Sequence, residues 1–265
     1  MNTFHYILIS LGLVFLVLRF GPRAQRPYAN TYLRYTILTL TGFLFLSPFF
    51  WLVAASIKDP DVLMTYTFLP PIREWSWETL NFKNFDKLFE PRQTPLGPVT
   101  FWRHITNSLF FASTTTVVQL FFCSLGGYTL AKYKFRGSQL LVIFMLASMM
   151  IPPILLFAPM YRLVVTLGWI DTYWALIVPG AANAFGMFLF RQAIMGVPDD
   201  IIEAGRIDGC SEFNIYLRLV MPLVRPMTGA FCLIVFLGTW NNFLGPQIFL
   251  HSESKLPLPV VLSQL

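Results

Sequence analysis

Charged residues are scarce in this chain of 265 residues: 12% of its residues are charged, whereas 55% are hydrophobic. A soluble domain of this size would carry about a quarter charged residues. The composition therefore excludes a soluble globular protein and indicates an integral membrane protein. The net charge of +6 does not require a nucleic-acid partner, because basic residues beside membrane spans are the usual mark of cytoplasmic loops. We expect none.

Metal-ligating and redox residues are also few. The three cysteines, Cys123, Cys210 and Cys232, lie far apart, and the three histidines have no ligand spacing on a helix. We therefore expect no metal or redox site. The chain has no G-x-x-x-x-G-K-[ST] phosphate loop, so it cannot hydrolyse ATP by that route. No titratable residue lies deep in an apolar run, which argues against an ion-coupled carrier or a membrane enzyme.

Long uncharged runs dominate what is present. A bilayer core of about 30 Å needs about 20 apolar residues per helix. The runs predict an all-α membrane protein, a polytopic bundle of about six transmembrane helices. The six runs are Met1–Leu18, Tyr35–Ile57, Ile105–Ala131, Gly137–Tyr161, Thr172–Phe190 and Pro226–Leu250.

The basic residues orient these spans. They gather in the loops after the first, third and fifth runs, which the positive-inside rule places in the cytoplasm. The loop 58–104 holds six basic and six acidic residues, so we expect it outside. Residues 1–34 are interpreted as an additional N-terminal transmembrane anchor and a basic cytoplasmic loop, because the first run lacks the basic start and cleavage site of a signal peptide.

One polar segment, Glu203–Gly209, interrupts the apolar sequence on the predicted cytoplasmic side. Asp200 followed by Glu203 is a variant of a capping box, which predicts the start of a helix. Gly209 is suited to end this helix in a left-handed conformation. Ser211 can cap a second helix, which Pro222 would stop or redirect. Two short helices with a tight turn between them form a surface suited to docking a partner.

This pattern resembles the coupling signature of ABC importer permeases: E-A-A, three residues, G, nine residues, then I-x-L-P. Glu203, Ala204, Gly209 and Pro222 match at the expected spacing. Gly205, Leu219 and Met221 replace Ala, Ile and Leu, and Gly205 should loosen the helix by up to about 1 kcal/mol. Further runs are similar to carbohydrate ABC permeases of the smaller, maltose- or glycerol-phosphate type, including Asn107–Leu109, Gly127–Tyr128, Phe188–Gln192, Thr239–Pro246 and Leu256–Pro259.

The resemblance covers residues 35–265 and implies a type I ABC importer permease in a bacterial or archaeal cytoplasmic membrane, crossing it several times. It implies a second, related permease, a cytoplasmic ATPase dimer that carries ATP and Mg, and an extracytoplasmic binding protein that delivers a sugar. This chain would then be no enzyme and hold no cofactor. Its coupling loop would be 191–225. The resemblance also implies one more helix after Leu256–Pro259, before which this chain ends. The residues that would contact the ATPase are Glu203, Ala204, Gly205, Asp208, Gly209, Leu219 and Pro222.

The polar residues inside the spans are uncharged. A hydroxyl-rich substrate would be bound by amides and aromatic rings, so Asn183, Trp240, Asn241 and Asn242 are candidates for the substrate path. The alternative is that such residues only join helices by hydrogen bonds. A permease of the same superfamily for a non-sugar solute is a second alternative, although a charged solute should leave charges on the spans.

Two further patterns are open to more than one interpretation. Pro152–Pro153, Pro159 and Pro179–Gly180 interrupt apolar runs, which fits helices around a cavity that opens and closes, but also simple packing. Phe82, Phe85 and Phe89 share one predicted helical face in the outside loop. That face would contact a binding protein or the partner permease, or would lie at the level of the lipid headgroups.

Overall fold

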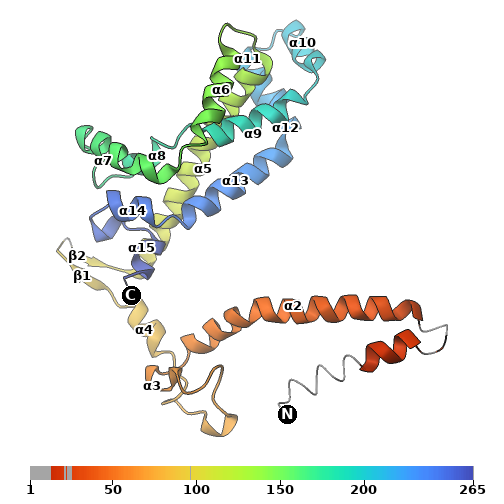
Figure 1. Cartoon of the computed structure of the whole chain (residues 1–265). Helices are drawn as coiled ribbons and strands as arrows, with labels where there is room; N and C mark the ends of the chain where they lie inside the picture. The colour runs from red at the N-terminus through yellow and green to blue at the C-terminus, as the bar shows by residue number, and fades with distance from the viewer. Residues whose placement is uncertain (1–12, 21, 23–25, 96, 265) are drawn as a thin grey trace. The chain divides into compact units, whose positions relative to one another are not determined.

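The computed structural model describes residues 13–20, 22, 26–95 and 97–264, in two compact units, Met1–Phe89 and Glu90–Leu265 (Figure 1). The predicted first span, Met1–Leu18, lies mostly outside the described residues. Its described part, residues 13–18, belongs to a helix that continues to residue 20.

The first unit contains one long helix, α2 (Arg26–Ser56). Tyr28–Ser56 is long and apolar enough to cross a membrane. The predicted boundary at Tyr35 was wrong, because the helix includes Arg34. Arginine is a good helix former, and its long side chain can reach the membrane surface from within a span.

The predicted outside loop is folded. It carries α3 (Pro60–Leu63), the 3₁₀ helix η1 (Ile72–Glu74) and α4 (Lys83–Phe89). The amide of Asn84 donates to the carbonyls of Ser56 and Lys58 at 3.1 and 3.0 Å, so α4 is held against the end of α2. The predicted helix with Phe85 and Phe89 is present, although Phe82 precedes it; all three rings are exposed.

The second unit begins with a hairpin, in which β1 (Arg92–Thr94) pairs antiparallel with β2 (Gly97–Val99), Arg92 opposite Val99. The helix α5 (Phe101–Lys132) follows and is long and apolar enough to span a membrane. The remaining elements are α6 (Ser138–Ser148), η2 (Pro153–Leu156), α7 (Phe157–Thr166), α8 (Trp174–Ile177), α9 (Ala184–Met195), α10 (Asp199–Ile207), α11 (Glu212–Asn214), the π-helix η3 (Ile215–Val220), α12 (Met221–Leu223), α13 (Arg225–Trp240), α14 (Leu244–Phe249), η4 (Glu253–Lys255) and α15 (Leu258–Leu262).

Three predicted single spans are interrupted. The run 137–161 breaks at Pro152–Pro153, where the axis bends by 98°. The run 172–190 divides into α8 and α9 around Pro179–Gly180, and the run 226–250 divides into α13 and α14 at Asn241. Proline lacks the amide N–H that continues a helix, and Asn241 caps the end of α13. Among the described residues two helices are long enough to cross alone, and two bent pairs could each add a span; the predicted count of six is not confirmed.

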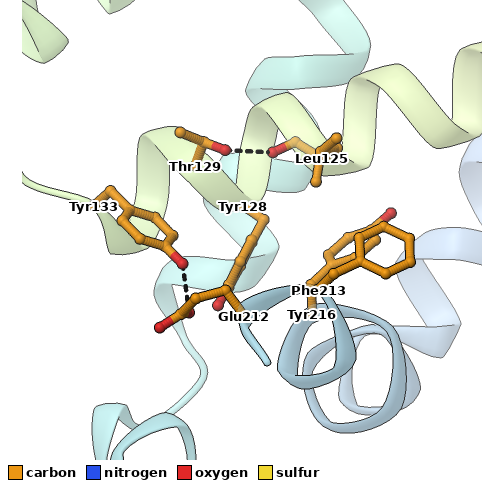
Figure 2. Close-up of a pocket in the computed structure, with 7 residues that line it drawn as sticks. All are labelled: Leu125, Tyr128, Thr129, Tyr133, Glu212, Phe213 and Tyr216. Atoms are coloured by element: carbon orange, nitrogen blue, oxygen red, sulfur yellow. Dashed lines mark hydrogen bonds between the residues drawn. The ribbon is translucent and has the colours of Figure 1, made fainter. Parts of the chain in front are cut away.

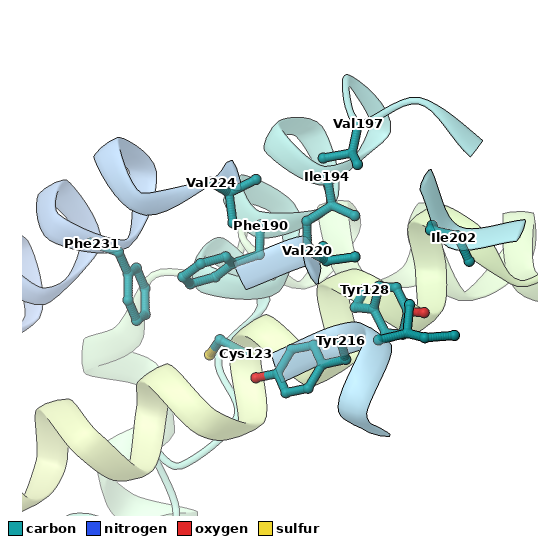
Figure 3. Close-up of a cluster of buried hydrophobic side chains, with 11 residues drawn as sticks. Cys123, Tyr128, Phe190, Ile194, Val197, Ile202, Tyr216, Val220, Val224 and Phe231 are labelled. Carbon is teal, nitrogen blue, oxygen red and sulfur yellow. The ribbon is translucent and has the colours of Figure 1, made fainter. Parts of the chain in front are cut away.

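The main core of the second unit lies where α9 and α13 pack along α5 (Figures 1 and 3). Glycines allow the close approach of α5 and α9. A Cβ on Gly127 would lie 2.6 Å from the Cβ of Phe190 and 2.8 Å from the backbone N of Arg191. The buried side chains of this core are Cys123, Tyr128, Phe190, Ile194, Val197, Ile202, Ile215, Tyr216, Val220, Val224 and Phe231.

Candidate functional site

The polar segment found in the sequence forms the helix α10. The predicted capping box is absent, because Pro198 is extended (φ −58°, ψ 137°) and the helix begins at Asp199. Asp200 therefore lies inside the first turn. Its negative charge interacts favourably with the helix dipole there, but its side chain does not cap an N–H group. The predicted end is confirmed: Gly209 is left-handed, with φ of 78°.

The second predicted helix is also present. The Ser211 hydroxyl accepts a hydrogen bond from the backbone N of Asn214 (3.3 Å). The helix ends at Leu223, one residue after Pro222, and its axis bends by 86° into α13. Its middle, Ile215–Val220, is a π-helix, which the sequence analysis did not predict. Single π-turns of this kind often lie at functional sites.

One face of α10 is buried and the other is exposed. Ile202 is 3% exposed and Gly205 is buried, whereas Glu203 and Ala204 are exposed and Ile207 is 86% exposed. The outer face of α10 is therefore accessible to another molecule, whereas the inner face is packed in the core.

Gly205 has a role that the sequence analysis missed. A Cβ at this position would lie 2.8 Å from Cδ1 of Leu219 and 3.2 Å from Cγ1 of Ile215. The missing side chain therefore lets α10 pack closely on the π-helix. The sequence did carry a signal for this contact, because both residues depart from the coupling signature. Gly205 is smaller than the Ala of the signature, and Leu219 is branched differently from its Ile.

Polar contacts tie α10 and α11 to the end of α5. Lys132, at the last position of α5, donates to Asp199 (2.6 Å) and to the carbonyl of Val197 (2.5 Å). The hydrogen bond from Lys132 holds the pKa of the Asp199 carboxyl below its ordinary value. These contacts connect α10 to a helix long enough to cross the membrane.

Glu212 makes the second link. It accepts hydrogen bonds from the guanidinium of Arg206 (Nε to Oε1, 2.7 Å) and from the hydroxyl of Tyr133, and these bonds lower its pKa. Glu212 and three tyrosine rings line a cavity of about 220 Å³ (Figure 2). Its lining residues are Leu125, Tyr128, Thr129, Tyr133, Glu212, Phe213 and Tyr216.

The four candidate residues for the substrate path have different surroundings. Asn183 accepts from the backbone N of Gly186 and donates to Gln119 of α5, both at 2.7 Å, so it caps α9 and joins it to α5. Trp240 stacks on Phe236, with centroids 5.9 Å apart. The exposed Asn241 donates to the carbonyl of Leu237 in its own helix (2.9 Å).

Asn242 lines a cavity of about 270 Å³. Pro153 and Pro179–Gly180 lie on the same walls, so the interruptions of three apolar runs meet there. Except for Asn242, the lining is apolar or backbone, formed by Pro153, Leu156, Phe157, Met160, Ala175, Leu176, Pro179, Gly180, Gly245 and Phe249.

At the opposite end of α5, two segments that carried the resemblance meet. Asn107 donates to the carbonyls of Ser254 and Leu256 (2.9 and 3.1 Å), and the Ser108 hydroxyl accepts from the backbone N of Leu258 (2.7 Å). These polar side chains join segments about 150 residues apart in the chain. This agrees with the alternative that polar residues in the spans join helices by hydrogen bonds.

Asp171, which the sequence analysis did not single out, fixes the same segment. Its carboxylate accepts from the backbone N–H groups of His251 and Ser252 (3.0 and 2.9 Å) and from the ammonium of Lys255 (2.8 Å). Burial raises the pKa of Asp171, but hydrogen bonds from Lys255, Ser252 and His251 outweigh it and hold the pKa well below its ordinary value.

Comparison with known proteins agrees with this arrangement. Residues 123–264 match the model of the family described as binding-protein-dependent transport system inner membrane component. The arabinooligosaccharides transport system permease protein AraQ of Bacillus subtilis is 35% identical over 226 residues, which cover 85% of this chain and 77% of AraQ. The lactose transport system permease protein LacG of Rhizobium radiobacter is 30% identical over 232 residues, covering 88% and 80%.

The fold has a solved counterpart. A chain in the crystal structure of a bacterial ABC transporter involved in the import of the acidic polysaccharide alginate superimposes with a TM-score of 0.75 at 22% identity, covering 92% of this chain and 82% of that one. The exposed face of α10, its links to α5 and the matched family model lead to one conclusion. The protein is a membrane-embedded permease, not an enzyme, and belongs to the family of binding-protein-dependent transport system inner membrane components.

Proposed function

We propose that this chain is a permease subunit of an ATP-driven importer that moves a sugar across the cytoplasmic membrane by alternating access. The names of its relatives, for arabinooligosaccharides and lactose, support the sugar. The uncharged runs 105–131 and 226–250 also favour a neutral solute. In this proposal ATP and Mg are bound by a partner ATPase dimer, a second permease completes the pathway, and an extracytoplasmic binding protein delivers the sugar.

The observation that carries the proposal is the two-faced helix α10. Its outer face, with Glu203, Ala204 and Ile207, is free to contact the ATPase, and its inner face is locked on the π-helix through Gly205 and Leu219. Asp208 and Gly209 form the exposed turn that follows. Pro222 turns the chain into α13. We infer that closure of the ATPase displaces α10 as a unit, and that Lys132 and Tyr133 pass this displacement to α5.

The cavity at Asn242 is the proposed region of the substrate path in this chain. Helices that are interrupted at Pro153, Pro179 and Asn242 can change their angles at lower cost than continuous helices, because fewer backbone hydrogen bonds must break. Asn242 offers a side-chain amide to sugar hydroxyls. Trp240 and Asn241 precede it at the end of α13, while Asn183 has the better support as a packing residue.

The docking role is tested by reversing one charge on the outer face. Glu203→Lys should weaken co-purification of the ATPase about tenfold, because opposed charges across an interface become like charges. Glu78→Lys, the same change at an exposed position of the first unit, is the matched control and should leave co-purification unchanged. ATPase recovery that is equal in both variants would refute the docking role of α10.

Substitutions of two asparagines test the proposed substrate path. Asn242→Ala should reduce uptake of the transported sugar while the complex assembles normally. Asn183→Ala should instead lower thermal stability by about 1–2 kcal/mol, because a helix cap and an interhelical hydrogen bond are lost. Uptake and unfolding temperature are measured on both variants in reconstituted vesicles. Normal uptake by Asn242→Ala would remove Asn242 from the path.

A further inference from the structure

A separate pocket lies where the ends of α5 and α9 meet the start of α6. Its volume is about 350 Å³, and it shares no residue with the cavity at Asn242 or with the cavity behind Glu212. Its polar lining groups are Ser138, Gln139 and Arg191, and its apolar wall is formed by Leu130, Val142 and Ile143.

Arg191 is the unusual group in this pocket. Its Nε is buried and has no hydrogen-bond partner among the described residues, and no carboxylate of the described part of the chain forms an ion pair with it. The backbone of Arg191 is fixed, because its N lies against Gly127 of α5. A charged donor buried in this way is unfavourable unless water or a ligand accepts its hydrogen bonds.

The chemistry of the pocket points to a phosphate. The planar guanidinium of arginine matches phosphate oxygens with two parallel hydrogen bonds. The Ser138 hydroxyl and the Gln139 amide are further donors on the opposite helix. The apolar wall continues onto α6, where Leu140, Ile143 and Phe144 are each more than half exposed. A free phosphate ion would gain nothing from this wall, whereas acyl chains would cover it.

We propose that this pocket binds the headgroup phosphate of an anionic glycerophospholipid, with Arg191 as its main ligand. The inference rests on the orientation in the proposed function, which places these helix ends at the cytoplasmic leaflet. Anionic lipids gather there, and basic pockets between transmembrane helices bind their headgroups. Lys134 and Arg136, exposed in the loop that leads into α6, add to the attraction.

The test counts retained lipids by native mass spectrometry. The chain is purified with its partners and incubated with vesicles of equal parts phosphatidylglycerol and phosphatidylcholine, with and without excess inorganic phosphate. Arg191→Gln should retain about tenfold less phosphatidylglycerol, the loss expected for one charge-assisted contact. Arg162→Gln removes one exposed charge from α7 at a residue that does not line the pocket, and it should behave as the wild type. Val142→Trp fills the pocket while Arg191 stays intact, so it should retain as little phosphatidylglycerol as Arg191→Gln. It is also the test variant if Arg191→Gln does not fold.

Three outcomes would overturn the inference. The first is equal retention of phosphatidylglycerol by the wild type, Arg191→Gln and Val142→Trp. The second is complete displacement of the lipid by inorganic phosphate, which marks a free-anion site. The third is loss of the second permease by Arg191→Gln without loss of lipid, which assigns Arg191 to a carboxylate of that partner. ATPase recovery is scored on the same samples, so failure of the lipid site is distinguished from failure of the importer assignment.

Discussion

At the scale of single residues, Asp171 fixes more of the chain than any other carboxylate described above. It has a left-handed backbone (φ 59°), and its backbone N donates to the carbonyl of Phe249 at 2.8 Å. Its side chain holds His251, Ser252 and Lys255. One residue therefore joins the turn before α8 to the segment between α14 and α15.

Asp171→Asn isolates the charge, because asparagine also tolerates a left-handed backbone. We expect amide hydrogen exchange in residues 250–257 to become about tenfold faster, since charge-assisted hydrogen bonds are lost. Because the folded pKa lies below the ordinary value of about 3.9, the stabilisation is fully present above that value and is lost only as pH falls through the folded pKa. After correction for intrinsic rates, the difference between variant and wild type should therefore be constant from pH 5 to pH 8. A difference that disappears within this range would contradict the assignment.

At the scale of elements, the crossing of α5 and α9 depends on the absence of side chains. Gly127 faces Phe190 and the backbone of Arg191, and a Cβ on Gly186 of α9 would lie 2.8 Å from the Sγ of Cys123 in α5. Small residues let membrane helices approach closely, since packing rather than water exclusion drives their association. The sequence analysis identified Gly127 only as part of a family run, because the partner surface lies about 60 residues further along the chain.

Two glycine substitutions should therefore have opposite effects. Gly127→Ala should lower stability by about 1–3 kcal/mol, because the new methyl group meets backbone that cannot move aside. Gly229→Ala in α13 has nothing within 4 Å of its Cβ and should raise stability by up to about 1 kcal/mol through helix propensity. Thermal unfolding in detergent measures both. Equal shifts would mean that the close contact at Gly127 has no energetic weight.

At the scale of the whole molecule, the orientation in the membrane decides whether α10 can meet a cytoplasmic ATPase. Cys210 follows Gly209 and is exposed, whereas Cys123 is buried. A membrane-impermeant maleimide should label Cys210 in inside-out vesicles and not in intact cells, and bound ATPase should protect it. Cys210→Ser should abolish the labelling. Labelling from the outside would reverse the orientation and exclude the docking role.

The sequence by itself determined the class and the outline of this protein. Scarce charge and long apolar runs depend only on composition, and they predicted a helical membrane protein. Gly209, Ser211 and Pro222 act through their own backbone preferences, so the turn, the second cap and the bend near α13 could be predicted. The boundary before α10 was missed by two residues, because the N-cap is Pro198 rather than Asp200.

Tertiary structure alone decided the contacts between distant segments. The bonds of Asp171 to Lys255 and of Asn107 to Leu256 join residues 84 and 149 positions apart, and no local preference encodes such pairs. The close fit of Gly205 against Leu219 depends likewise on which surfaces meet. So does the Nε of Arg191, which has no partner in the part of the chain that the structure describes. Local patterns fix where the chain turns and which segments enter the membrane, whereas packing fixes which side chains are left free to bind.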